Sequence, residues 1–177
     1  MNVTQIVPAL AVSVAVCAAI SDVKERRIPN RLTYSAMVAG LVLQAVLHGW
    51  NGLLLSAGGG LQFGGVFLLL YLVRAMGAGD VKLAAALGSI VGSSASFPIL
   101  VATASAGCLL AICFMVLSGR LVETLLNTLW VAQFHAQHGL QVHPVLNLDN
   151  PGTVRMPYGL AFAAGTVYWA VSLGLRG

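Results

Sequence analysis

Long runs of apolar residues, separated by short polar segments, dominate the chain. A bilayer core of roughly 30 Å needs about 20 apolar residues in helical form to span it. Six runs come close to that length, and they cover residues 3–20, 32–47, 53–73, 81–96, 97–117 and 157–175. Pro98 and a serine-rich turn mainly separate the fourth run from the fifth. The pattern predicts an all-α integral membrane protein whose six transmembrane helices use up the chain as one domain, residues 1–177.

Residues 118–156 are too polar to form another span, but their first part has helical periodicity. The apolar positions fall on one face, and they are Leu121, Val122, Leu125, Leu126, Leu129, Trp130 and Phe134. A helix lying in the membrane interface fits this spacing, and an ordinary helix folded onto the protein fits it as well. We take the interfacial amphipathic helix in a cytoplasmic loop as the prediction. Two GxxxG pairs, Gly60/Gly64 and Gly88/Gly92, are assigned to close helix packing.

Composition and charge support a membrane location. The chain is 58% hydrophobic and 8% charged, with a mean hydropathy of +0.89, whereas a soluble domain has about 25% charged residues. Eight of the nine Lys and Arg fall in the first, third and fifth loops, which the positive-inside rule makes cytoplasmic. They are Lys24, Arg26, Arg27, Arg31, Arg74, Lys82, Arg120 and Arg155. The net charge of +4 therefore reflects topology rather than nucleic-acid binding. Both termini are expected outside, with the first helix retained rather than cleaved as a signal peptide.

Asp22 and Asp80 stand at the cytoplasmic ends of apolar runs in a chain that has only five Asp and Glu. A carboxylate beside a hydrocarbon region is costly and usually functional. Two carboxylates can hydrolyse a peptide if one is ionised and activates water while the other, protonated, polarises the carbonyl. Structural alternatives exist for each residue alone, since Asp80 can cap a helix and Asp22 can be a solvated loop acid paired with Lys24 or Arg26.

Three motifs carry a family resemblance. Residues 22–30 (DVKERRIPN) resemble the D-x(5)-I-P-N signature of type IV prepilin leader peptidases. Residues 77–83 (GAGDVKL) resemble the G-x-G-D-x-K-[LM] signature of the same family, and residues 156–159 (MPYG) are similar to its P-[YF]-G. All three occur in order and at matching helix positions, so the resemblance covers essentially the full chain.

The resemblance implies a membrane-embedded aspartic endopeptidase with Asp22 and Asp80 as the catalytic pair. It implies that Gly77 and Gly79 shape the loop before Asp80 and that Lys82 tunes Asp80 or meets the substrate. A simpler role for Lys82 is that of a positive charge that helps to set the orientation in the membrane. Asn30 is expected to be the N-cap of the second helix. The implied substrates are prepilins and pseudopilins with a basic leader, and the implied partners are the bilayer and the pilus assembly machinery. No cofactor or nucleic acid is expected.

The chain departs from longer members of that family, which carry a cytoplasmic region with paired CxxC cysteines and also methylate the trimmed pilin. The three cysteines here lie in apolar runs and form no CxxC, so no separate methyltransferase domain is expected. The short form resembles the peptidases of tight-adherence (Flp-type) pili, and also the archaeal preflagellin peptidases. The former resemblance is the better one, which implies a multi-pass protein of the bacterial cytoplasmic (inner) membrane, with active-site loops on the cytoplasmic side.

Two other functions remain open from the residues alone. A small proton-coupled transporter would use intramembrane acids, but it would place them near the midplane and show repeats. A non-enzymatic subunit of a pilus or secretion assembly would need neither aspartate. The clustered His135, His138 and His143 lack a carboxylate partner, so we expect no metal there.

Overall fold

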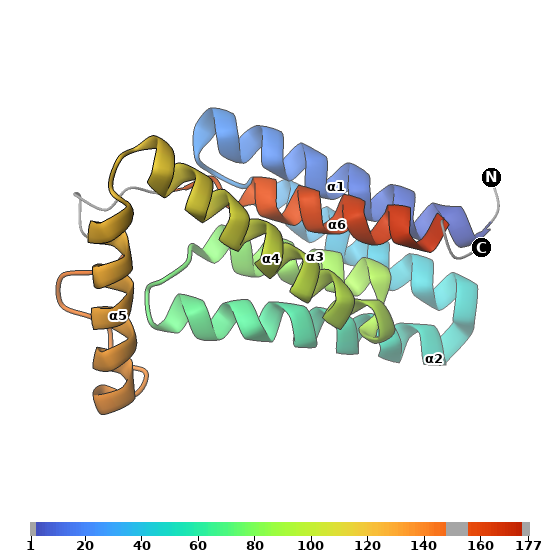
Figure 1. Cartoon of the computed structure of the whole chain (residues 1–177). Coiled ribbons are helices and arrows are strands. Elements are labelled where there is room, and N and C mark those ends of the chain that lie inside the picture. The colour runs from blue at the N-terminus through green and yellow to red at the C-terminus, as the bar shows by residue number, and fades with distance from the viewer. Residues whose placement is uncertain (1–2, 148–155, 175–177) are drawn as a thin grey trace.

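The computed structural model describes residues 3–147 and 156–174. Every regular element in these residues is a helix, which confirms the all-α prediction. The helices are α1 (Val3–Glu25), α2 (Asn30–Leu72), α3 (Ala78–Val91), α4 (Ser93–Leu117), α5 (Leu121–His138) and α6 (Gly159–Gly174). Figure 1 shows α1, α2, α3, α4 and α6 as a bundle, with α5 lying across one end of it. Arg155, predicted in the fifth loop, lies outside the described residues.

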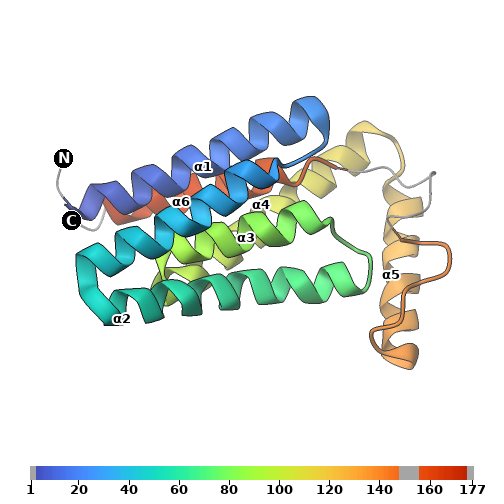
Figure 2. The same cartoon turned by 180° about the vertical axis from the view of Figure 1, so that it is seen from behind.

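Helix α2 contains the second and third predicted segments, joined by a sharp reversal. Gly49 has φ 62° and ψ −143°, which are not helical values. Figure 2 shows that the two halves of α2 run in opposite directions. A positive φ is readily adopted by glycine because it has no Cβ. One residue therefore replaces the connecting loop that the sequence predicted for residues 48–52.

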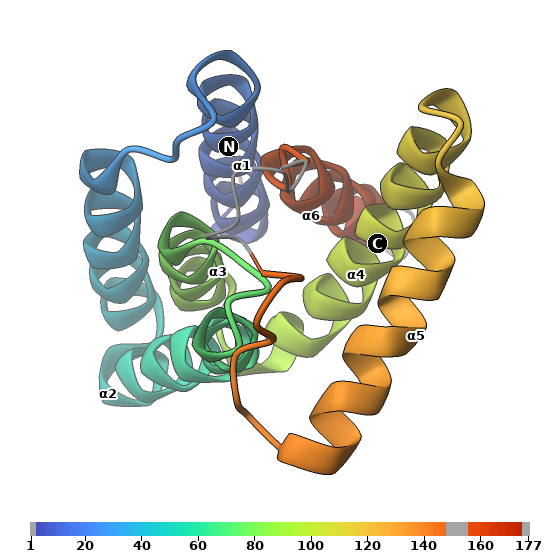
Figure 3. The same cartoon turned by 90° about the vertical axis from the view of Figure 1, so that its left-hand side faces the viewer.

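Helix α3 lies at the centre of the bundle, between α1, α4 and the two halves of α2 (Figure 3). Its side chains are buried on all sides from Leu83 to Val91, apart from the half-buried Ala85. Small residues bring α2 and α3 together. An added Cβ at Gly88 would overlap the backbone carbonyl of Gly59, and one at Gly64 would lie 2.8 Å from the Cβ of Ala85. Gly64 and Gly88 thus pack helices, as their GxxxG patterns predict.

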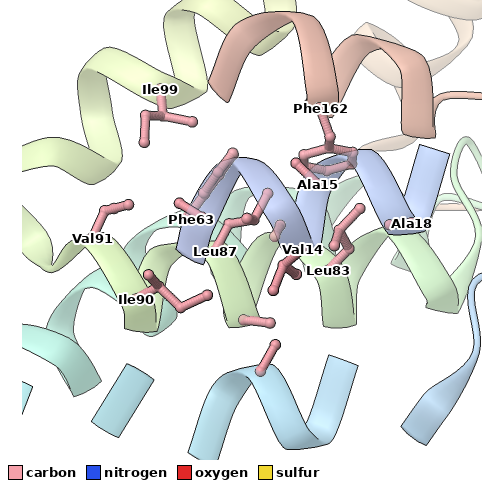
Figure 4. Packing of buried hydrophobic residues seen from close by; sticks show 14 of the residues in the cluster. Val14, Ala15, Ala18, Phe63, Leu83, Leu87, Ile90, Val91, Ile99 and Phe162 are labelled. Carbon is pink, nitrogen blue, oxygen red and sulfur yellow. The ribbon is translucent and has the colours of Figure 1, made fainter. Parts of the chain in front are cut away.

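The apolar core surrounds α3 (Figure 4). Leu83, Leu87 and Ile90 of α3 are fully buried, as are Phe63 of α2 and Phe162 of α6. Aromatic rings fill the space between α2 and α6, where the centroids of Phe63 and Phe162 are 5.7 Å apart. Because α3 is packed into this core, the core determines where the first turn of α3 lies in the bundle.

The break between α3 and α4 corrects one prediction. Helix α3 ends at Val91, and Gly92 follows with φ 79°. Helix α4 then starts at Ser93 and includes Pro98, so the proline does not separate the two helices. Glycine stops α3 because it adopts the positive φ that side chains disfavour. Pro98 is the sixth residue of α4, and the helix continues through it.

The start of α2 corrects another prediction. Pro29, not Asn30, is the N-cap of α2, and Asn30 is its first helical residue. The cap makes no side-chain hydrogen bond. The Asn30 side chain is therefore available for a contact with another helix, described below.

Helix α5 lies crosswise at the end of the bundle where α1 ends and α3 begins (Figures 1 and 2). None of its residues is buried. The exposed apolar side chains are Leu121, Val122, Leu125, Leu126, Leu129 and Trp130. Among the described residues, the apolar face of α5 is therefore exposed.

Within the part of the chain that the structure describes, three helices are long and apolar enough to cross a membrane, and they comprise Gln5–Glu25, Asn30–Leu72 and Ser93–Leu117. Helix α6 is apolar but shorter. The long second segment contains the reversal at Gly49, so it supplies two antiparallel apolar stretches. These helices indicate a membrane protein.

Candidate active site

Asp22 lies in the last turn of α1, which continues to Glu25. The Asp22 side chain is buried, with 9% of its surface exposed. Its Oδ2 accepts a hydrogen bond from the backbone N–H of Gly159, at 2.7 Å. Gly159 opens α6, and the first N–H groups of a helix have no partner within it. The carboxylate of Asp22 therefore joins the end of α1 to the start of α6.

The absence of a side chain at Gly159 allows this contact. An added Cβ would lie 2.9 Å from the Cβ of Asp22 and 3.0 Å from the Cα of Ala19. Both distances are too short for carbon atoms, and one of the neighbours is backbone. Any larger residue at position 159 would therefore push α1 and α6 apart at Asp22.

Asp80 lies in the first turn of α3, three residues after the N-cap Gly77. Asp80 is not the N-cap residue, but its Oδ2 accepts a hydrogen bond from the Gly77 N–H at 3.1 Å, so it does cap the start of α3, as the sequence allowed. Burial raises the pKa of the Asp80 carboxyl, the Gly77 hydrogen bond lowers it, and the charge of Asp22 raises it, with a net pKa of about 6. Asp80 precedes the apolar stretch that begins at Val81, so it stands outside the expected span.

Both aspartates open onto one pocket of about 480 Å³. The pocket lies where the end of α1, the following loop and the first turn of α3 meet. Its lining comprises Asp22, Glu25, Arg26, Arg27, Ile28, Pro29, Asn30, Gly77, Ala78, Gly79, Asp80 and Lys82. Three of the five acidic residues of the chain are therefore in its wall, together with three basic residues. The structure thus brings all five sequence-predicted site residues to one pocket.

Gly77 and Gly79 differ in what surrounds them. An added Cβ at Gly79 would lie 3.3 Å from the Cβ of Ile28, across the pocket wall. An added Cβ at Gly77 would lie 3.3 Å from the Oδ2 of Asp80. Gly79 therefore lets the loop after α1 approach α3, whereas Gly77 leaves room for the second carboxylate.

Lys82 connects α3 to the start of α2. Its Nζ donates a hydrogen bond to the Oδ1 of Asn30 at 2.9 Å and lies 5.3 Å from the centroid of the Tyr34 ring. The second distance is within the range of a cation–π contact. Lys82 thus helps to hold the first turns of α2 and α3 side by side at the pocket.

Sequence reasoning missed three residues of this site. It noted the motif that contains Gly159 but assigned that glycine no contact, because the partner is 137 residues away. It also gave no role to Ile28 or to Glu25, which line the pocket. The sequence did contain a signal for Glu25, because an acidic residue three positions after Asp22 is unusual in a chain with only five Asp and Glu.

The three clustered histidines lie away from the pocket and gather around Phe134. The ring of His138 stacks on it at 4.5 Å and that of His143 meets it edge-on at 4.8 Å. The Nδ1 of His143 also accepts the backbone N–H groups of Val145 and Leu146. Across residues 3–147 and 156–174, no group of three His, Cys, Asp or Glu is placed to hold a metal ion.

Comparisons with known proteins agree on one family. A family model described as the type IV leader peptidase family matches residues 9–116, more than half of the chain and a stretch that includes both aspartates. The chain is 38% identical over 80 residues to the prepilin peptidase EppA of Methanocaldococcus jannaschii. That alignment covers 45% of this chain and 22% of the relative, so the chain matches about a fifth of the length of that protein. No solved structure matches the chain.

Proposed function

The chain belongs to the type IV leader peptidase family, and from this premise we propose that it is a membrane-embedded aspartic endopeptidase. Its substrates are type IV (Flp-type) prepilins and pseudopilins, from which it removes the N-terminal basic leader. The observation that carries the proposal is the single pocket onto which Asp22 and Asp80 both open. Neither residue is close to the other in sequence, and two different helices deliver them to the same cavity.

The proposed reaction needs one ionised and one protonated carboxyl group. The ionised group removes a proton from a water molecule while the water oxygen bonds to the scissile carbonyl carbon. The protonated group transfers its proton to the carbonyl oxygen, so a tetrahedral diol forms. Its collapse breaks the C–N bond and returns a proton to the leaving amine. The raised pKa of Asp80, about 6, supports a carboxyl group that can hold a proton near neutral pH.

Charge and chain composition support the choice of substrate. The pocket wall holds three acidic and three basic side chains, and the acidic ones, Asp22, Glu25 and Asp80, can pair with basic residues of a leader. The described cysteines are Cys17, Cys108 and Cys113, and they contain no CxxC pair. We assign the chain to the Flp-type pilus system, where it acts with the pilus assembly machinery.

The proposal includes a location. The chain crosses the bacterial cytoplasmic membrane six times, through the apolar parts of α1, both halves of α2, α3, α4 and α6, and both aspartates lie at the ends of these parts. Both termini are outside, and the pocket opens at the cytoplasmic face, where the basic loops lie. Helix α5 lies in the interface with its exposed apolar face in lipid. Its crosswise position at the pocket end of the bundle supports this orientation.

Co-expression with a tagged Flp-type prepilin tests the proposal, with leader loss followed as a size shift. Asp22→Asn and Asp80→Asn each abolish cleavage while the protein stays in the membrane. Glu123→Gln is a matched control, because it removes an acid from exposed α5, outside the pocket. Normal cleavage by either aspartate variant would refute the catalytic pair and favour a transporter or an assembly subunit.

A further inference from the structure

Helix α6 contributes a backbone N–H group to the site, and this group donates a hydrogen bond to Asp22. We propose that the N–H of Gly159 holds Asp22 as the ionised, water-activating member of the pair, so that Asp80 carries the proton. Gly159 is then a positioning residue that acts through Asp22. The inference rests on the proposed function, because it assigns roles within that catalytic pair.

The hydrogen bond to Asp22 has the geometry of a charge-assisted bond. The distance from the Gly159 N to the Asp22 Oδ2 is 2.7 Å. Hydrogen bonds from N–H groups are this short mostly when the acceptor is ionised. The donor belongs to the first residue of α6, where the free N–H groups and the helix dipole favour a negative charge. Because Asp22 is buried, water does not readily replace this donor.

The surroundings of Asp80 are less favourable to charge. Its backbone hydrogen bond, from Gly77, is longer at 3.1 Å. Burial of this carboxyl outweighs that bond, and the net pKa is about 6. Two neighbouring carboxylates resist simultaneous ionisation, so one proton is shared unequally between them. The asymmetry of the two hydrogen bonds places that proton on Asp80.

Four other charged groups line the pocket that both carboxylates share. From the end of α1, the following loop and α3 they are Glu25, Arg26, Arg27 and Lys82. The titratable group next to the contact on α6 is Tyr158, whose phenol packs against Gly107 of α4. The N–H of Gly159, in contrast, reaches Asp22 directly.

The roles proposed for Asp22 and Asp80 determine where each proton goes during hydrolysis. Asp22 accepts the proton of the attacking water and later gives it to the leaving amine. Asp80 gives its proton to the carbonyl oxygen and recovers it when the diol collapses to the new carboxyl product. Each cycle consumes one water molecule and returns both side chains to their starting states.

The pH profile of cleavage by Gly159→Ala tests the assignment. The new methyl group pushes Asp22 away from the N–H of residue 159, so the acid limb moves to higher pH by about one unit. The maximal rate falls at least tenfold, with little change in KM. Gly165→Ala is the matched control, because Gly165 is on the same helix as Gly159 but away from the pocket. An added Cβ at Gly165 would lie 2.5 Å from the backbone N of Thr103 on α4. This variant lowers the yield of folded protein and leaves the pH profile unchanged. A wild-type profile for Gly159→Ala, or an equal shift for Gly165→Ala, would overturn the assignment.

Infrared spectroscopy supplies a measurement that does not depend on either glycine variant. At about pH 5 the folded wild-type protein shows the C=O stretch of a protonated, buried carboxyl group. This band disappears in Asp80→Asn and remains in Asp22→Asn; the reverse result refutes the assignment. If both aspartate variants are inactive and the bands are reversed, only the division of roles fails. If either variant still cleaves prepilin, the proposed function itself fails.

Discussion

At the scale of single residues, Asp80 combines two opposing properties. It is an acid, and it stands at the start of the most deeply buried helix of the bundle. Its one backbone hydrogen bond, from Gly77, does not compensate for the loss of water around the carboxylate, so its pKa stays raised. A residue chosen for stability alone would be uncharged here, so the conflict supports a role in chemistry.

Replacing Asp80 should therefore make the folded protein more stable. The pKa of Asp80 is about 6 when folded and 3.8 for the unperturbed group, so folding costs free energy above pH 6 and costs none below about pH 3.8. We expect Asp80→Asn to raise the free energy of unfolding at pH 8 by on the order of 1–2 kcal/mol. Thermal unfolding in detergent measures this. The gain should shrink as the pH falls from 6 to 4, and a gain that persists at pH 3.5 would contradict this explanation.

The contact between Gly79 and Ile28 predicts a graded effect of side-chain size on cleavage. With Gly79→Ala, the Ile28 side chain must move by a few tenths of an ångström, so we expect a loss of a few fold in kcat/KM. Gly79→Val adds two more methyl groups to the pocket wall, and we expect a loss of more than a hundredfold. Gly65→Val is the control, because position 65 has open space around it. Equal activity of both Gly79 variants would show that this wall does not matter.

At the scale of secondary-structure elements, α3 depends on its contact with α2. At Gly59 and Gly88 the two backbones approach so closely that neither helix can accommodate a Cβ. Hydrogen bonds accompany this contact, since Ser56 Oγ donates to the carbonyl of Ser89 at 2.6 Å. Because the first turn of α3 carries Asp80, this packing also sets the position of the second carboxylate.

Gly88→Ala should therefore separate α2 from α3. The methyl group would meet the backbone of Gly59, which cannot rotate away, so we expect a loss of several kcal/mol in stability or no folded protein. Gly65→Ala, on α2 in open space, should instead be neutral or stabilise by about 0.5–1 kcal/mol. Thermal unfolding and the yield of detergent-soluble protein distinguish the two. Similar behaviour of both variants would contradict the packing explanation.

The sequence predicted the elements well and their ends less well. Apolar runs predicted every helix of the bundle, because lipid and core both select for hydrophobic side chains. The boundary between α3 and α4 was wrong because Pro98 is visible as a helix breaker, whereas the positive φ of Gly92 depends on the packing around it. The motifs predicted the residues that share the pocket. The donor for Asp22 was missed, since no local pattern shows that α6 begins beside α1.

At the scale of the whole molecule, the pocket lies where α1 ends and α3 begins. Helix α5 lies across that same end of the bundle (Figures 1 and 2). If α5 lies in the membrane interface, the pocket is at the same depth. The carboxylates can then reach water, while the helix of a substrate stays in lipid. The exposed apolar face of α5 and its crosswise orientation both support this arrangement.

The depth of Trp130 tests the placement of α5. Trp130 is exposed on the apolar face, and the chain has two other tryptophans, Trp50 and Trp169. In a Trp50→Phe, Trp169→Phe variant reconstituted in vesicles, we expect a blue-shifted emission that lipids brominated near the headgroup quench more strongly than lipids brominated near the chain end. Trp130→Phe in the same background controls for residual signal. Emission at the wavelength of water-exposed tryptophan, without quenching, would place α5 off the membrane.

The reversal of α2 at Gly49 bears on how a cell makes this protein. Because one residue turns the chain, the two halves of α2 share only a few polar groups at their far end, among them His48 and Asn51. No hydrophilic domain has to be carried through the lipid between them. The two halves can therefore enter the membrane together as one hairpin, and α3, which follows after five residues, can pack against both of them.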